Sequence, residues 1–439
     1  MFRRKWSGLP KDPSFPFDLK ELGYFINDVD EVRAIDNPNN YFKYFINRNP
    51  RWNDRQRFSM NLALQDVIWK RLKDLGMEMQ HLPLIPSDPT QPRVPIFLSK
   101  DINSASRVVV VIGESHQDLG VLAHRVIGGP GGVTKGSMVS IVSALQQQSC
   151  SATDMSSPGI ILANIGELIW WVEEHRTLSL SAFQATPMKS AVHRGNKITS
   201  VNYAEGNENP TAHINSIFEK VIPQFVDEDA KIDVLGVGDG ADLAVKYLDK
   251  LTMRDEWKNR LGCLALVGGM VAARELENEE FKKGFLRNRT RAYATCKDPA
   301  GLVISGPEGN PNTSTFTDQG CPVFSSGSDL YMETTLITAR DVVLDWMQEV
   351  AMTPEGEEYM NPKFQVVFRD PKLEGLTEPD WSQWERDDLG TESVDGEGQV
   401  FMMPEIKFAN ATEPGKDQDK SKSGAAGAGL VLATRPKPE

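Results

Sequence analysis

A glycine-rich turn within residues 231–247 has the residue types and spacing that come closest to catalytic chemistry. It starts with the apolar run 232–235, passes through Gly236-Val-Gly-Asp-Gly240 and continues into helix-forming residues. A strand, a sharp turn and a helix with the pattern G-x-S-x-G raise a nucleophilic serine above a sheet. Here Gly236 and Gly240 hold the flanking positions, and Gly238 holds the serine position. The turn therefore carries no nucleophilic side chain.

The histidines point to the same conclusion. In the α/β-hydrolases, which use this kind of turn, the triad follows the chain order serine, acid, histidine. All six histidines precede the turn: His81, His116, His124, His175, His193 and His213. A general base in the usual chain order is therefore missing. The sequence predicts a degenerate elbow at Gly236, Gly238, Asp239 and Gly240, with no catalytic residue, cofactor or metal.

Other readings of the same turn stay open at this point. Gly236-Val-Gly-Asp-Gly-Ala241 also fits a permissive dinucleotide-binding pattern, but the strand that follows runs into Gly268-Gly269 rather than ending in the expected acid. Asp239 could be an aspartate nucleophile, although Val237 would then occupy a position that requires a small residue. A glycine-rich strand-helix turn with no ligand is the favoured interpretation.

A polar loop follows the apolar run 108–112. It reads Gly113-Glu-Ser-His-Gln-Asp-Leu-Gly120 and stands where an α/β-hydrolase supplies a donor to its oxyanion hole. We expect Glu114, Ser115 and His116 to border the cleft that such a fold would have. A hydrolase or small-ligand-binding protein that uses this residual cleft is the alternative to a non-catalytic one. Hydrogen bonds that structure the loop are the favoured role.

Two further segments resemble binding motifs in composition. Residues 127–137 are as rich in glycine as a phosphate loop, but Lys135 precedes Gly136 and Ser137, so the Walker spacing is not met. A mobile loop leading into a helix is the favoured interpretation. Arg287, Arg289 and Arg291 alternate, and would share one face if extended. They are candidate contacts for RNA or an acidic partner, against the simpler reading of an exposed edge strand.

The body of the chain alternates between short apolar runs and helical stretches. Such alternation predicts a doubly wound, mostly parallel α/β sheet. The predicted strands are 108–112, 159–163, 232–235 and 264–267, with 291–296 and 322–324 as additional ones. The predicted helices are 135–148, 211–225, 239–251 and 331–350.

Composition divides the chain into four parts. Residues 1–92 are predicted to form an aromatic and helical cap, with a helix from Asn53 to Leu75 whose other face carries Arg55, Arg57, Lys70, Arg71 and Lys73. Residues 93–353 form the α/β domain. Residues 354–411 are an acidic linker with short ordered segments, such as 364–368. Residues 412–439 lack a packing pattern and are predicted to be disordered.

Charge and cysteine content limit the classes of function. The chain has a net charge of −13, and residues 354–439 hold 18 acidic and 10 basic side chains, which leaves −5 for the body. A basic nucleic-acid-binding face is not indicated. The longest apolar run, 263–273, is too short to span a bilayer, and four scattered cysteines fit a reducing compartment.

Three segments together resemble the argonaute-binding (Arb-type, second member) domain family. They are Asp18–Asn27 (DLKELGYFIN), Gly113–Gly120 (GESHQDLG) and Gly320–Gly327 (GCPVFSSG). Related domains occur at the C-terminus of class II histone deacetylases and in animal co-transcriptional regulators linked to argonaute. The resemblance spans about residues 15–350, and some of the animal relatives look closer to true hydrolases at the elbow, from which Gly238 departs.

The resemblance implies an α/β-hydrolase-like fold and a role in small-RNA silencing and heterochromatin. The resemblance implies a subunit of an argonaute-containing complex that holds duplex small RNA. Together with the degenerate elbow it leads us to expect a non-catalytic adaptor in the nucleus, with a cytoplasmic pool besides. Its contact with RNA would be indirect, and histone-modifying proteins are further implied partners. With the fold carried over, Asp298 falls in the loop of the triad acid, and Ser325 and Ser326 fall in the loop of the triad histidine.

Overall fold

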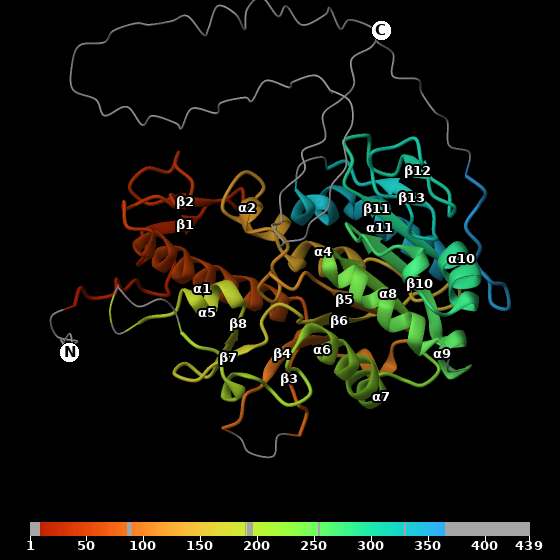
Figure 1. Cartoon of the computed structure of the whole chain (residues 1–439), viewed down its shortest axis with the longest axis horizontal. Coiled ribbons are helices and arrows are strands. Elements are labelled where there is room, and N and C mark those ends of the chain that lie inside the picture. The colour runs from red at the N-terminus through yellow and green to blue at the C-terminus, as the bar shows by residue number, and fades with distance from the viewer. Residues whose placement is uncertain are drawn as a thin grey trace, which may run out of the picture. The chain divides into compact units, whose positions relative to one another are not determined.

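The apolar runs of the body form one large sheet. In the computed structural model, nine strands of the described residues pair in the order β12-β13-β11-β10-β9-β5-β6-β4-β3 (Figure 1). The structure describes residues 9–85, 90–188, 190, 196–252, 255–328 and 331–364. The strands are β3 (Met77–Leu82), β4 (Val94–Ser99), β5 (Arg107–Ile112), β6 (Gly159–Ala163), β9 (Lys231–Val237), β10 (Leu261–Val267), β11 (Thr290–Ala294), β12 (Val303–Ser305) and β13 (Val323–Ser325).

The sheet is mostly parallel. The neighbours from β13 through β11, β10, β9 and β5 to β6 pair in parallel, whereas β4, β3 and β12 join in antiparallel fashion. Two short hairpins lie outside it: β1 (Tyr24–Ile26) with β2 (Val32–Ala34), and β7 (Ile169–Trp171) with β8 (Arg176–Leu178). The prediction of a doubly wound, mostly parallel α/β sheet of the hydrolase type is confirmed.

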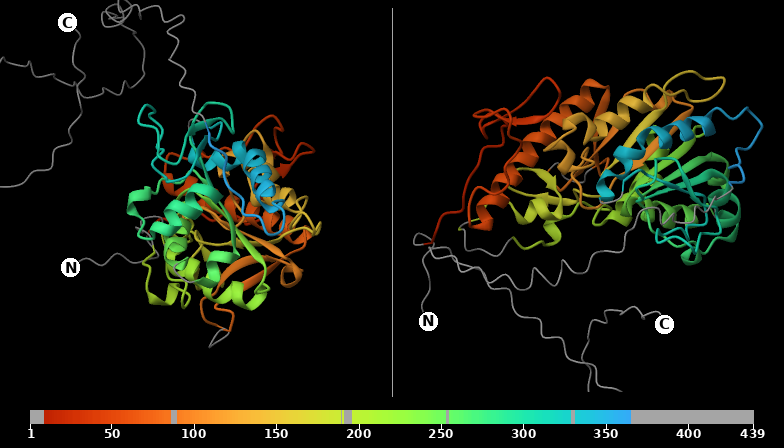
Figure 2. Two further views of the ribbon diagram at one scale, coloured as in Figure 1. Left: turned by 90° about the vertical axis from the view of Figure 1, so that its right-hand side faces the viewer. Right: turned by 90° about the horizontal axis from the view of Figure 1, so that it is seen from above.

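Helices cover both faces of the sheet (Figures 1 and 2). One face packs against α1 (Pro50–Asp74), α4 (Met138–Leu145) and α11 (Thr335–Ala351). The other packs against a helical run formed by α6 (Pro210–Ser216), the π-helical segment η4 (Ile217–Val221) and α7 (Ile222–Phe225), and against α8 (Asp239–Leu251) and α9 (Asp255–Arg260). The shorter helices are α2 (His124–Ile127), α3 (Gly132–Lys135), α5 (Leu180–Gln184) and α10 (Arg287–Arg289).

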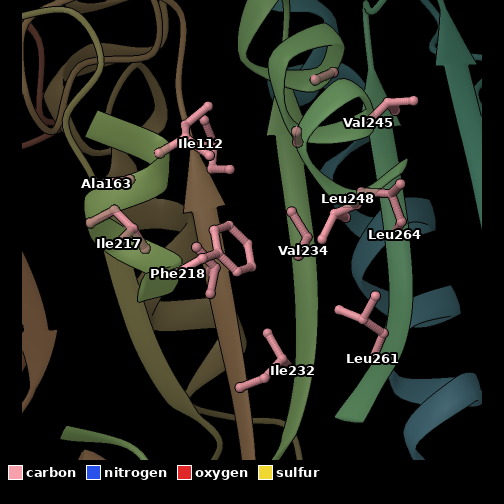
Figure 3. Close-up of a cluster of buried hydrophobic side chains, with 14 of the residues drawn as sticks. Ile112, Ala163, Ile217, Phe218, Ile232, Val234, Val245, Leu248, Leu261 and Leu264 are labelled. Carbon is pink, nitrogen blue, oxygen red and sulfur yellow. The ribbon is translucent and has the colours of Figure 1, made fainter. Parts of the chain in front are cut away.

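Each face of the sheet has its own apolar core. Figure 3 shows part of one of them, where Val234 of β9, Leu264 of β10 and Leu248 of α8 lie together. Strands buried on both faces are apolar at nearly every position, which explains the apolar runs seen in the sequence; the buried Arg107 of β5 and Asp233 of β9 are exceptions that pair with each other. In the described residues, no helix is long and apolar enough to cross a membrane.

The order of the strands places a switch point between β5 and β9. The chain passes from β5 to β6 on one side and then returns to β9 on the other side of β5. At such a point the connections leave in opposite directions, and the carboxyl ends of the two strands border a crevice where ligands of α/β proteins usually bind. The loop 113–120 follows β5 and the glycine turn follows β9, so both candidate motifs lie there.

Several predicted boundaries are wrong for local reasons. Helix α1 starts at Pro50, because Asn49 rather than Asn53 accepts the backbone N–H of Arg51. The predicted helix 135–148 is interrupted between α3 and α4. The boundary at residues 92/93 falls between β3 and β4, which pair along their whole length, so the predicted cap contributes a strand to the sheet. The predicted disordered tail and most of segment 364–368 lie outside the described residues.

A buried ion pair joins the strands on either side of the switch point. Arg107 of β5 donates through Nε to Oδ2 of Asp233 on β9 at 2.6 Å, and both side chains are buried. The guanidinium also donates to the carbonyl oxygens of Ser149 and Met347, and Asp233 accepts the backbone N–H of Cys263. The pair thus ties three strands to the end of α11 and to the chain that follows α4.

Replacing Asp233 with alanine should lower the free energy of unfolding by about 3–5 kcal/mol, because Arg107 would stay buried without a counter-ion. Urea denaturation monitored by circular dichroism measures this. The control is Arg274→Ala, which removes an exposed pair with Asp318 and should cost about 0.5 kcal/mol or less. Equal losses in the two variants would contradict the role given to the buried pair.

Candidate functional site

The turn between β9 and α8 has the geometry of a nucleophile elbow. Gly238 has φ 56° and ψ −129°, and its backbone N–H donates to the carbonyl oxygen of Val267 at 2.8 Å. A positive φ is costly for residues with a Cβ and is tolerated by glycine. The strained position that a nucleophile holds in α/β-hydrolases is therefore present, and a glycine occupies it.

The two flanking glycines are required by close contacts within the chain. A Cβ on Gly236 would lie 2.5 Å from Cα of Ala241, and a Cβ on Gly240 would lie 2.9 Å from the carbonyl oxygen of Ile112 and closer still to that of Gly113. Helix α8 therefore starts directly against the end of β5. These contacts account for the glycines, so the turn needs no bound nucleotide to explain them.

Glu114 occupies the space above the elbow. A Cβ on Gly238 would lie 2.6 Å from Cγ of Glu114 and closer still to its Oε1. Burial raises the pKa of the Glu114 carboxyl, and the nearby Asp239 carboxylate raises it further. The place where a hydrolase projects its nucleophile is thus filled by a carboxyl group from the neighbouring loop.

Ser115 is held by the residue that follows the elbow. Its backbone N–H donates to Oδ1 of Asp239 at 2.9 Å, and its hydroxyl donates to Oδ2. In α/β-hydrolases, backbone N–H groups of this loop and of the residue after the nucleophile stabilise an oxyanion. Here the N–H of Ser115 is engaged by a carboxylate of the chain itself. This loop donor is therefore not available to a substrate.

The rim of the elbow is formed by an ion pair and exposed apolar side chains. Arg125 donates to Oε1 of Glu333 at 3.1 Å, and its guanidinium lies 3.8 Å from the centre of the Tyr331 ring. Met332 packs beside Gly268, at the end of β10. His116, in the same loop as Glu114 and Ser115, is exposed. Beneath the loop lies a cavity of about 20 Å³, far below the roughly 300–1,000 Å³ of small-molecule sites.

The loops corresponding to the triad acid and histidine lie against each other. The hydroxyl of Ser325 donates to the carbonyl oxygen of Asp298 at 2.6 Å and to that of Cys296 at 3.1 Å. Ser326 is buried, and its backbone N–H donates to the carbonyl oxygen of Ala294. The side chains of both serines are thus inside the protein, and Ser325 serves to join the two loops.

A buried polar network beneath the loop 113–120 was missed by the sequence analysis. Glu167 accepts Nε2 of Gln65 and the backbone N–H of Leu119, each at 2.8 Å, and Asp118 accepts Nε2 of His124 at 3.1 Å. The run Asn164-Ile-Gly-Glu167, polar residues directly after a buried strand, is the signal that could have indicated it.

The pKa values of the two acids in this network are shifted in opposite directions. Burial raises the pKa of Glu167, the charge of Asp118 adds to this effect, and the result is about 8. Burial also acts to raise the pKa of Asp118. The hydrogen bonds from His124 and Ser179 and the charges of His124 and Arg176 outweigh this effect, so the pKa of Asp118 is lowered. The network therefore favours the charged form of Asp118 and the protonated form of Glu167.

The glycine-rich segment 127–137 binds an internal carboxylate. Asp30, at the tip of the β1–β2 hairpin, accepts the backbone N–H of Val133 with its carbonyl oxygen and that of Thr134 with its carboxylate. Arg71 pairs with the same carboxylate at 2.7 Å. The N–H groups of Val133 and Thr134 in α3 are therefore satisfied by the chain itself. A Cβ on Gly132 would lie 2.7 Å from the carbonyl carbon of Asp30, so this glycine is required without a phosphate.

The prediction that Arg287, Arg289 and Arg291 share one extended face is wrong. Arg287 and Arg289 lie in α10, and only Arg291 lies on a strand. Arg289 donates to the carbonyl oxygen of Leu261, and Arg291 lies among the rings of Phe324, Trp346 and Phe364. Similarly, Arg55 from the predicted exposed face of α1 is buried against Asp12.

Among the histidines, His213 is a structural residue. It is fully buried, accepts the backbone N–H of Asn164 at Nε2, and donates from Nδ1 to Asn207. Burial lowers its pKa to about 3, so it stays neutral. It therefore joins α6 to the chain that follows β6.

Comparison with known proteins identifies one matching family and several solved structures with low sequence identity. The family model described as the Arb2 domain matches residues 15–300. No curated protein matches the chain.

Three solved structures are similar to parts of the chain at 12–13% identity. Carboxyl esterase 2 from the mycorrhizal fungus Tuber melanosporum has a TM-score of 0.30, 12% identity, and coverage of 63% of this chain and 87% of its own. Esterase LipW from Mycobacterium marinum has a TM-score of 0.26, 12% identity, and coverage of 60% and 62%. A bacterial heroin esterase has a TM-score of 0.27, 13% identity, and coverage of 66% and 92%.

Serine at position 238 should destabilise the protein in two separable ways. Gly238→Ser forces a Cβ into a positive-φ position, which costs about 1–3 kcal/mol, and adds a clash with Glu114. Glu114→Ala should relieve the clash but not the strain. Urea denaturation of the wild type, the two single variants and the double variant gives four free energies of unfolding. We expect the double variant to lose less stability than the sum of the two single losses. Strict additivity would show that Glu114 does not fill the nucleophile's place.

Stability should depend on the protonation of Glu167. Because folding raises its pKa from 4.5 to about 8, the stabilisation from this proton is fully present below pH 4.5 and is lost as the pH rises to about 8. Glu167→Gln is neutral throughout, so the stability of the wild type relative to this variant should fall between pH 5 and about pH 8. A difference that stays constant over this range would contradict the assignment.

Proposed function

The chain belongs to the Arb2 domain family, and on this basis we propose that it is a non-catalytic adaptor in small-RNA-mediated silencing. It acts in the nucleus as a subunit of an argonaute-containing complex that contributes to heterochromatin formation. The family supplies the biological setting of this proposal. The elbow supplies the reason to call the protein an adaptor rather than an enzyme.

The observation that carries the non-catalytic part is Glu114 above Gly238. A hydrolase needs a nucleophile, a base and an oxyanion hole in one crevice. At Gly238 the nucleophile is missing, and the backbone N–H of Ser115 is bound to Asp239. No histidine follows His213 in the chain. The crevice that remains is a packed polar junction, which supports a structural role for this part of the fold.

Charge supports an indirect contact with RNA. The body carries −5, and two of the three arginines that were candidate contacts, Arg289 and Arg291, are partly buried and hydrogen-bonded to groups of the chain itself. Proteins that bind nucleic acid directly gain much of their affinity by neutralising phosphates. Their affinity therefore falls steeply as the salt concentration rises. Contacts with a protein of the complex are therefore the main source of affinity in this proposal.

Affinity purification from nuclear extract should capture argonaute, and capture should survive nuclease treatment. Filter binding of duplex small RNA to the purified chain should show weak affinity with a shallow dependence on salt, because few phosphates are neutralised. Absence of argonaute from the purified material would overturn the adaptor role. Tight binding of RNA alone with a steep salt dependence would instead make the chain a direct RNA-binding protein.

A second experiment measures the hydrolysis of activated acyl esters, because a hydrolase would show this activity and a non-catalytic adaptor would not. The wild type should not exceed a heat-denatured sample. Gly238→Ser in the Glu114→Ala background should not gain turnover either, because a serine without a base is poorly activated. Saturable turnover by the wild type would favour the hydrolase.

A further inference from the structure

The helices α6–η4 and α8 pack with their inner sides against the core shown in Figure 3. Their outer surfaces form a groove between them. The hollow has a volume of about 430 Å³. Residues from both helices line it: Thr211, Ile214, Asn215 and Glu219 from one, and Leu243, Lys246, Tyr247, Lys250 and Leu251 from the other. The groove is thus framed by two helices and is separate from the elbow.

The floor of the groove is apolar and well fixed. Ile214 and Leu251 are buried, and Leu243 and Tyr247 are half-buried. The Tyr247 ring lies 4.9 Å from that of Phe218, centre to centre, and its hydroxyl contacts Glu219 at 3.5 Å. A floor of this kind offers apolar surface that an apolar side chain of a partner can bury.

The two walls differ in charge. On α8, Lys246 and Lys250 are exposed and stand four residues apart, so they face the same direction. On the opposite wall, Thr211, Asn215 and Glu219 follow each other at the same spacing. Lys246 pairs with Glu275 at 3.4 Å, but both side chains are about half exposed, and such pairs contribute little. The α8 wall is therefore cationic in a chain whose net charge is negative.

A second hollow extends the groove along the same seam. It has a volume of about 810 Å³ and shares Glu219 and Leu251 with the first. Its lining is apolar at Phe218, Pro223 and Trp257. It carries charges of both signs at Glu228, Asp229, Lys231 and Arg260, so the cationic part of the seam is the α8 wall of the first hollow. The continuous length suits an elongated partner segment better than a compact small molecule.

We propose that this groove is the docking surface for an acidic amphipathic helix of a partner protein. The partner places apolar side chains, three or four residues apart, over Leu243 and Tyr247. It places two carboxylates, four residues apart, against Lys246 and Lys250. A helix suits the site because ridges at four-residue spacing line both walls, and such ridges accept the ridge of a third helix. The proposal rests on the proposed function only for the identity of the complex that supplies this helix.

A synthetic peptide tests the groove independently of any complex. The probe is a fluorescent helical peptide with leucines at three- and four-residue spacing and two glutamates four residues apart on one side. The full chain should bind it saturably, as measured by fluorescence anisotropy. The double variant K246E/K250E should bind it roughly tenfold more weakly, because two attractions become repulsions. A peptide with lysines in place of the glutamates should bind this variant better than it binds the wild type.

The matched control carries the same change of charge on the other face of the sheet. Lys70 and Lys73 are exposed on α1, and K70E/K73E should leave the affinity for the acidic peptide within about twofold of the wild type. Lack of saturable binding by the wild type would overturn the proposal. So would equal weakening in both double variants, since that would show only the effect of net charge.

Capture of argonaute by K246E/K250E then links the groove to the complex. Capture should fall in this variant and persist in K70E/K73E. Undiminished capture by K246E/K250E would overturn the groove as the docking surface. If the wild type itself captures no argonaute, the proposed function fails, whereas the peptide titration still decides whether the groove binds an acidic helix.

Discussion

The positive φ of Gly238 is the constraint on which the centre of this structure depends. The chain passes from β9 into α8 through this one residue, and the start of α8 lies against the end of β5. Gly236 and Gly240 follow as consequences, because no Cβ fits at either position. Hydrolases use the same strained turn to expose a nucleophile. In this protein a glycine holds that position, and the close contacts of the turn pack α8 against β5.

Carboxylates of the chain itself occupy the positions where the fold could bind an anion. Asp239 takes the backbone N–H and hydroxyl of Ser115, and Asp30 takes the N–H of Thr134 at the start of α3. Glu114 fills the space above Gly238. Each of these contacts joins segments far apart in the chain, so groups that could recognise a ligand hold the tertiary structure together instead.

Because of these contacts, the polar groups at the strand ends are engaged within the chain, and we look for a binding surface on the helical faces instead. The crevice at the switch point is closed by the loop 113–120, which the buried network around Asp118 and Glu167 holds from below. The groove between α6–η4 and α8 offers an apolar floor and a cationic wall instead. The same fold can serve different functions, so the surface outside this crevice is where we propose that a partner docks.

The sequence alone determined the features that depend on local patterns. Apolar runs such as 108–112 and 232–235 indicated buried parallel strands, the interval 239–251 matched α8, and Gly238 identified the missing nucleophile. Contacts between distant residues were decided by the tertiary structure. Ser115 meets Asp239 across 124 positions, and the burial of Arg291 depends on rings from β13, α11 and Phe364. Periodicity reports which face of an element is buried, but the identity of the buried neighbour follows only from how the elements pack.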